Sequence, residues 1–160
     1  MLYLLRNAWA LLLGMLLLMI GNGVQGTLLG IRGSIEGFAP DVMSYLMSAY
    51  MIGMLIGSQV APILIINVGH VRVFAALASL ISASFLGFAL FVDPTAWFIL
   101  RLLVGFCFSG VYVASESWLN EAASNENRGK AMSVYMIVQM SGILMAQVLI
   151  NFGDPASYIL

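Results

Sequence analysis

Charged residues, cysteine and histidine are scarce in this sequence. Only 8% of its 160 residues are charged, against about 25% in a soluble domain. The balance of 6 Lys and Arg against 7 Asp and Glu offers no basic surface for nucleic acid. The single cysteine, Cys107, excludes an intrachain disulfide, and with one histidine, His70, it forms neither a metal-ligand pattern nor a nucleophile–base pair. We therefore expect no metal, no cofactor, no nucleic-acid partner and no enzymatic activity.

Apolar residues are abundant instead, at 62% of the chain, against about 45–50% in soluble domains. A soluble core of this size could not hide so much apolar surface, so the solvent must be the lipid bilayer. A spanning helix needs about 20 apolar residues, and a transmembrane barrel would show alternating segments of about 10 residues. The sequence predicts an all-α polytopic transmembrane helix bundle over residues 1–160. Its expected spans are 8–31, 42–68, 73–92, 95–119 and 131–152.

The apolar segments at the two ends of the chain can each be interpreted in more than one way. The first apolar run is longer than a signal-peptide core and lacks a small-residue cleavage site after it, so we expect a retained first helix. After Pro155 the sequence ASYIL, residues 156–160, is typical of the first turn of a sixth helix. We infer the N-terminal part of a longer chain; the alternative is a five-span protein with a short outer tail.

Orientation follows from the Lys and Arg residues in the short loops. With the N-terminus in the cytoplasm, four basic residues lie in inner loops and only Arg32 lies in an outer loop. The inner four are Arg6, Arg72, Arg128 and Lys130. The sequence therefore predicts a cytoplasmic N-terminus.

Arg101 is the most unusual residue of the fourth span. It lies about 9 Å inside the helix from the outer end. A charge at this depth in the bilayer costs free energy, so an ionisable residue there is a candidate functional residue. Its long stem could extend to the outer headgroups. Alternatively it faces a water-filled cavity, together with Gly105, Phe108 and Tyr112, which recur on the same stripe of the helix.

Glu116 lies near the inner end of the same helix, about 22 Å from Arg101, so these two cannot pair. The nearest expected cation is Arg72 in the turn before the third span, and this pair would latch the cytoplasmic mouth. The alternative is a solvated interfacial carboxylate beside Trp118.

Amide side chains occur within two other spans. Asn22 and Gln25 stand in the glycine-rich stretch GNGVQG, which could interrupt the first helix and expose backbone to a cavity. Gln139 lies near the middle of the fifth span. The alternative for all three is hydrogen bonding between packed helices. The pairs Gly26/Gly30 and Gly53/Gly57 are packing signals, and the 11 methionines fit lipid contact and gap filling or, alternatively, an adaptable pocket.

Three segments together resemble a known family. Residues 57–72, GSQVAPILIINVGHVR, resemble its signature between helices two and three, although the acidic residue before the second glycine is absent. RLLVG, residues 101–105, is similar to its Arg-x-x-x-Gly signature, and NEAASNENRGKAMSVYM, residues 120–136, to its entry into helix five. The chain resembles the N-terminal half of a bacterial-type major facilitator superfamily transporter.

The resemblance implies twelve helices in two halves, with a small solute bound between the halves at mid-membrane and carried by alternating access. Helices one, four and five would line the cavity, which makes Asn22, Gln25, Arg101, Tyr112 and Gln139 the candidate cavity residues. The partners implied are the solute, the bilayer of the bacterial inner membrane and the C-terminal half. The alternative function is a non-transporting helix-bundle scaffold or assembly protein. Arg101 suits an anionic solute, whereas the methionines and aromatic residues suit a drug-like cation.

Overall fold

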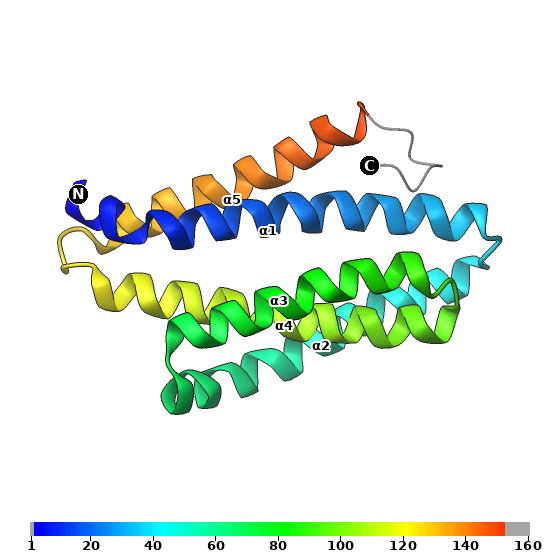
Figure 1. Ribbon diagram of the computed structural model, residues 1–160, viewed down its shortest axis with the longest axis horizontal. Helices are drawn as coiled ribbons and strands as arrows, with labels where there is room; N and C mark the ends of the chain where they lie inside the picture. Colours follow the sequence, from blue (N-terminus) through cyan, green and yellow to red (C-terminus); the bar gives the residue numbers. More distant parts are fainter. Residues whose placement is uncertain (1, 153–160) are drawn as a thin grey trace. The chain divides into compact units, whose positions relative to one another are not determined.

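The computed structural model describes residues 2–152, with side chains from residue 8 onward, and shows five long helices (Figure 1). They are α1 (Leu2–Ile35), α2 (Pro40–Val68), α3 (His70–Leu90), α4 (Pro94–Ala122) and α5 (Arg128–Ile150). No strand occurs among residues 2–152, and all five helices are long and apolar enough to cross a membrane. The predicted fold class is confirmed. The expected start of a sixth helix at 156–160 lies outside the described residues.

The helix boundaries follow local residue chemistry. Pro40 and Pro94 stand at the first helical positions of α2 and α4, where their missing N–H costs nothing. Asp93 caps α4 by accepting a hydrogen bond from the Ala96 N–H at 3.0 Å. Gly69 has a φ of 91°, which a side chain would strain, and it alone separates α2 from α3. The turn expected at residues 69–72 is therefore wrong in extent, and Arg72 lies in the first turn of α3.

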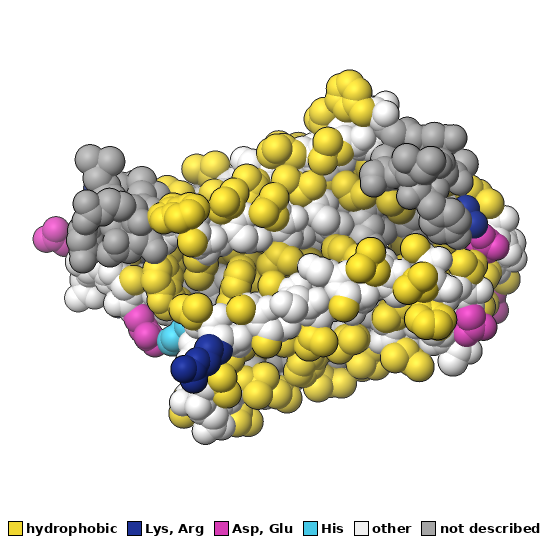
Figure 2. Space-filling view, in the orientation of Figure 1, with side chains coloured by type: hydrophobic (Ala, Val, Ile, Leu, Met, Phe, Trp, Pro, Cys, Tyr) yellow, Lys and Arg dark blue, Asp and Glu magenta, His cyan; other side chains and the backbone are white. Residues whose placement is uncertain are grey.

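The surface of these helices fits lipid rather than water. On the face drawn in Figure 2, hydrophobic side chains lie along the middle of the helices, whereas the Lys, Arg, Asp and Glu side chains that are visible lie toward the helix ends. Large apolar side chains such as Ile66, which is 83% exposed, lie open on the outside. Such an array would be unfavourable in water and is the ordinary state of a bilayer-facing helix.

The chain divides into two compact units. The α1–α5 unit contains residues 2–36 and 118–152 of the described part, and the α2–α4 unit contains residues 37–117. In both units, glycines bring two helices into close contact.

In the α2–α4 unit, Gly53, Gly57 and Gly105 form the seam between α2 and α4. A Cβ added to Gly105 would meet the backbone of Tyr50, 2.9 Å from its carbonyl carbon, and one on Gly53 would lie 2.8 Å from the Phe106 nitrogen. Such contacts are possible only where no side chain separates the backbones. The packing role expected of Gly53 and Gly57 is confirmed.

Aromatic side chains pack together where α2 and α4 begin and α3 ends. Trp97 of α4 is 1% exposed. Its ring meets those of Phe38 and Phe88 edge to face, with centroids 5.1 Å and 5.9 Å away. Such pairs add about 0.5–1.5 kcal/mol each beyond the burial of their area. They join the segment before α2 to the hairpin of α3 and α4.

In the α1–α5 unit, Gly142 of α5 faces the backbone of α1, and a Cβ there would lie 2.6 Å from that of Met19. Gly23 of α1 faces Ala146 in the same way. By contrast, a Cβ on Gly26 or Gly30 would meet nothing within 4 Å among the described residues. Figure 1 shows that α5 diverges from α1 toward the C-terminal end of α5.

Candidate functional site

Arg101 lies in the α2–α4 unit with its guanidinium turned onto α2. The side chain is only 5% exposed. Its Nη2 donates to Met47 Sδ at 3.5 Å, and its Cζ stands 5.5 Å from the centroid of the Tyr50 ring. These two contacts are with α2, and neither Met47 nor Tyr50 carries a negative charge. The guanidinium thus packs on α2, and its place at a water-filled cavity stays a prediction.

The glycine seam explains why these two α2 residues reach Arg101. Gly105 stands one turn after Arg101 on α4 and contacts the Tyr50 backbone directly. Tyr50 lies three residues before Gly53, so it shares the α4-facing side of α2. Met47 lies one turn earlier on α2. Met47 and Tyr50 were not among the predicted site residues, although the three-residue spacing from Tyr50 to Gly53 indicated that Tyr50 shares the packing face of α2.

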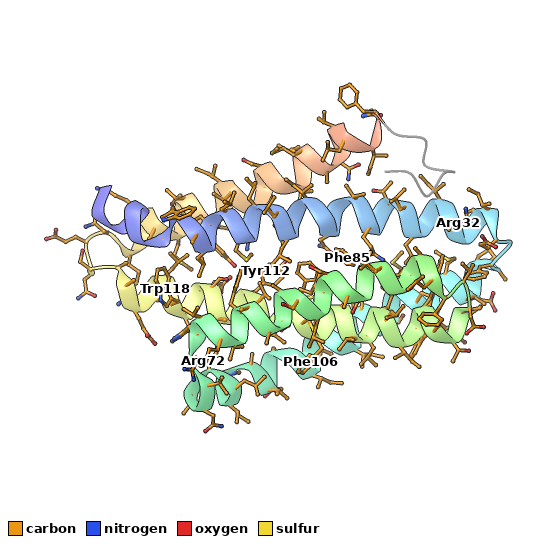
Figure 3. The ribbon with its side chains drawn as sticks, viewed as in Figure 1. Arg32, Arg72, Phe85, Phe106, Tyr112 and Trp118 are labelled. Atoms are coloured by element: carbon orange, nitrogen blue, oxygen red, sulfur yellow. The ribbon has the colours of Figure 1, made fainter. Side chains whose placement is uncertain are left out.

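Beyond Arg101 and Gly105, α4 carries two neighbouring aromatic rings, and whether this stripe faces a cavity stays a prediction. The rings of Phe108 and Tyr112 lie 6.1 Å apart, and Phe85 of α3 stands 6.5 Å behind Phe108. Phe108 is fully buried, whereas Tyr112 is half-buried. In Figure 3 Phe85 and Tyr112 lie toward the middle of their helices, while Arg72 lies at the end of α3. The α2–α4 unit thus places one cation and a series of rings along a single helix.

At the other end of α4, His70 joins α3 to α4. Its Nε2 and the Oγ of Ser117 lie 3.0 Å apart, in hydrogen-bond contact. This contact brings the end of α3 that carries Arg72 to the part of α4 that carries Glu116. Both Arg72 and Glu116 are exposed, and within residues 8–152 Arg72 forms no ion pair. The latch between them stays a prediction.

We expect Ser117→Ala to lower the stability of the complete protein by about 1 kcal/mol, because a typical intramolecular hydrogen bond contributes that much. Thermal unfolding in detergent measures the change. Ser79→Ala is the matched control, since the Ser79 hydroxyl is exposed and bonds only to the Ala75 carbonyl of its own helix. Equal unfolding temperatures for the two variants would show that the contact between His70 and Ser117 contributes nothing.

The three amide candidates belong to the α1–α5 unit. Asn22 is next to Gly23, and Gln139 lies three residues before Gly142, so both border the seam between α1 and α5. Gln25 lies two residues after Gly23, which turns it about 200° around the helix, away from α5. The interruption expected at GNGVQG is wrong: α1 is helical without a break from Leu2 to Ile35, because Gly and Asn are tolerated inside a spanning helix that packs on a neighbour.

Comparison with known proteins identifies the family. The sequence profile of the Major Facilitator Superfamily matches residues 11–152. The chain belongs to this superfamily. It is 27% identical over 146 residues to the MFS-type transporter YcaD of Escherichia fergusonii and 28% identical to the MFS-type transporter Ent638_1421 of Enterobacter sp. strain 638. Both names describe uncharacterized transporters. No solved structure matches the chain significantly.

The matches cover 91% of this chain but 38% of each of these relatives. Members of the superfamily sit in the lipid bilayer and carry small solutes, so the chain belongs to a family of integral membrane transporters. Membership implies a transporter rather than an enzyme.

Proposed function

We propose that the complete protein is a secondary active transporter of a small solute, working by alternating access in the bacterial inner membrane with its N-terminus in the cytoplasm. The relatives extend well beyond the length of this chain. We expect their remaining helices to correspond to a C-terminal half that supplies the second wall of the passage. The five helices described above supply the first wall.

The inward placement of Arg101 carries this proposal. A guanidinium in a spanning helix is costly, and here its contacts lie within the protein. We infer that a charge kept at this cost serves a solute passage. We assign Arg101 and Tyr112 on α4, Asn22 and Gln25 on α1, and Gln139 on α5 to the wall of the passage. Arg72 and Glu116 serve as the cytoplasmic gate in a state in which they approach each other.

A solute-exchange assay tests the proposal. Proteoliposomes that contain the complete protein are loaded with a mixture of labelled metabolites. They are then diluted into the same metabolites without label, and the loss of label from the vesicles is measured. We expect at least one solute to exchange faster than in protein-free liposomes. Exchange of none across a broad mixture, with correctly oriented protein, would favour the scaffold alternative.

Two glutamines of α5 provide a matched pair for the same assay. Gln139→Leu should reduce exchange about 2- to 10-fold, the effect of losing one hydrogen bond. Gln147→Leu, an exposed position on α5 outside the proposed wall, should leave the rate unchanged. Equal rates for the two variants would remove Gln139 from the wall.

A further inference from the structure

The four methionines of α2 lie on one side of that helix. Met47, Met51 and Met54 follow Met43 by four, eight and eleven residues, so all four lie within about 80° of one another around the helix axis. Met47 is 42% exposed and Met51 is 60% exposed, while Met43 and Met54 are half-buried. We call these four side chains the methionine face. Steps of three and four residues are the spacing of a seam between packed helices.

The other sides of α2 differ from the methionine face in chemistry. Gly53 and Gly57 mark the side that packs on α4. A third side, the aliphatic face, is centred about 130° from the methionine face and is exposed. It consists of Ile52, Leu55, Ile56, Ile63 and Ile66. A bilayer presents the same acyl chains to every side of a helix, so the separation of thioethers from branched side chains indicates two different neighbours.

The contact with Arg101 indicates which of the two faces meets protein. Nη2 of Arg101 donates to Met47 Sδ at 3.5 Å. Charged groups within spanning helices almost always face the interior of a bundle or a water-filled cavity, because acyl chains cannot solvate them. If acyl chains covered Met47, they would also lie one side chain away from this guanidinium. The bilayer therefore suits the aliphatic face, and the methionine face suits protein.

We propose that the methionine face is the surface on which the rest of the complete transporter docks, and that its thioethers let the docked helices shift between two arrangements. The proposal rests on the transport function proposed above. The matched relatives are long enough to supply this partner, because the aligned residues cover only 38% of each.

Methionine is suited to a partner that moves. Its unbranched side chain has three rotatable bonds and fills irregular gaps, and methionine-rich surfaces can repack against more than one arrangement of a partner. Isoleucine, by contrast, is held in few rotamers by its branch at Cβ. Alternating access requires the two halves of a transporter to change their contact while staying together. The methionine face would keep this contact closed in both arrangements.

Met51 and Leu55 are the matched positions for a test of docking. They lie one turn apart on α2, one on each face, and are 60% and 70% exposed. After Cys107→Ser, single cysteines at these positions are spin-labelled in the complete protein, at one copy per nanodisc. Power saturation measures the access of each label to oxygen, which concentrates in lipid, and to a water-soluble nickel chelate. We expect the label at Met51 to be at least about 3-fold less accessible to oxygen, because close packing excludes small molecules, and both labels to be shielded from the chelate.

Three results would overturn the docking. Equal access of oxygen to the two labels would place the methionine face in lipid. Access of the nickel chelate to the label at Met51 alone would place the face in water. Protection of Met51 that occurs only in nanodiscs holding two copies would assign the face to a second copy of the protein.

A pair of double variants tests the shifting contact. Met51→Ile with Met54→Ile should slow solute exchange about 3- to 10-fold, because the added branches oppose repacking in the step that changes the contact. Ile52→Met with Ile56→Met, on the aliphatic face, is the control and should leave the rate unchanged. Equal rates for the two double variants would exclude the shift.

The two measurements separate this proposal from the transport function. Exchange with equal oxygen access at Met51 and Leu55 leaves the transporter and removes the docking. Protection of Met51 without exchange of any solute leaves the docked contact and removes the transport function together with the shift.

Discussion

Gly105→Val is expected to disrupt the packing of α2 against α4 and to cause the largest loss of stability of any single change in the α2–α4 unit. The added atoms would fall on the backbone of Tyr50, which has no flexible side-chain end to move aside. Overpacking a tight contact costs about 1–3 kcal/mol or more. We expect Gly105→Ala to lower the unfolding temperature of the complete protein by about 5 °C or more, and Gly105→Val to prevent recovery of a monodisperse protein.

Gly30→Ala and Gly30→Val are the matched controls. Gly30 is also a glycine within a long spanning helix, but a Cβ there meets nothing within 4 Å among the described residues. Both variants should unfold within about 2 °C of the unsubstituted protein, since alanine and valine are ordinary residues in spanning helices. If Gly105→Ala were as stable as Gly30→Ala, the close approach of α2 and α4 would be wrong.

Arg101→Leu is expected to leave the protein folded and to remove most of its transport. The contacts of the guanidinium with α2 include a thioether and a ring face, and a cation–π contact contributes about 0.5–2 kcal/mol. Losing these two contacts should lower the unfolding temperature by no more than about 4 °C. A charge-assisted bond to a solute contributes about 1.5–3 kcal/mol, so solute exchange at low concentration should fall about 10- to 150-fold.

The lysine variant separates charge from shape at this position. Arg101→Lys keeps the positive charge but loses the planar pair of donors, so its exchange rate should lie between those of arginine and leucine. Unchanged exchange in Arg101→Leu would exclude contact between Arg101 and the solute. A large loss of stability in the same variant would give Arg101 a structural role instead.

Hydropathy was sufficient to predict the fold class, because a run of about 20 apolar residues in lipid has to satisfy its backbone internally as a helix. The glycines of α2 were also recognised as packing signals. Which helix they would face was not predictable, since periodicity describes one helix at a time. For that reason Arg101 and Gly105 were found, but Met47 and Tyr50 on the opposite helix were not.

Two local expectations failed for a related reason. The glycines and amides around Asn22 were expected to interrupt α1, and residues 69–72 were expected to form a turn. In a membrane, leaving backbone groups without hydrogen bonds is costly, so helices continue through residues that would end them in water. Only Gly69, with its positive φ, separates two helices there. The placement of Asn22, Gln25 and Gln139 around a passage remains a prediction.

The most direct test is the access of water to the polar residues of the spans. Single cysteines are placed at Asn22, Tyr112 and Gln139 of the complete protein after Cys107→Ser, and are treated in membranes with a charged, thiol-specific methanethiosulfonate reagent. Asn125 in the loop before α5 serves as the accessible control and Leu86 on the outside of α3 as the lipid-facing one. We expect labelling at all three positions, as at Asn125, and none at Leu86. Labelling at Asn125 alone would contradict a water-filled passage.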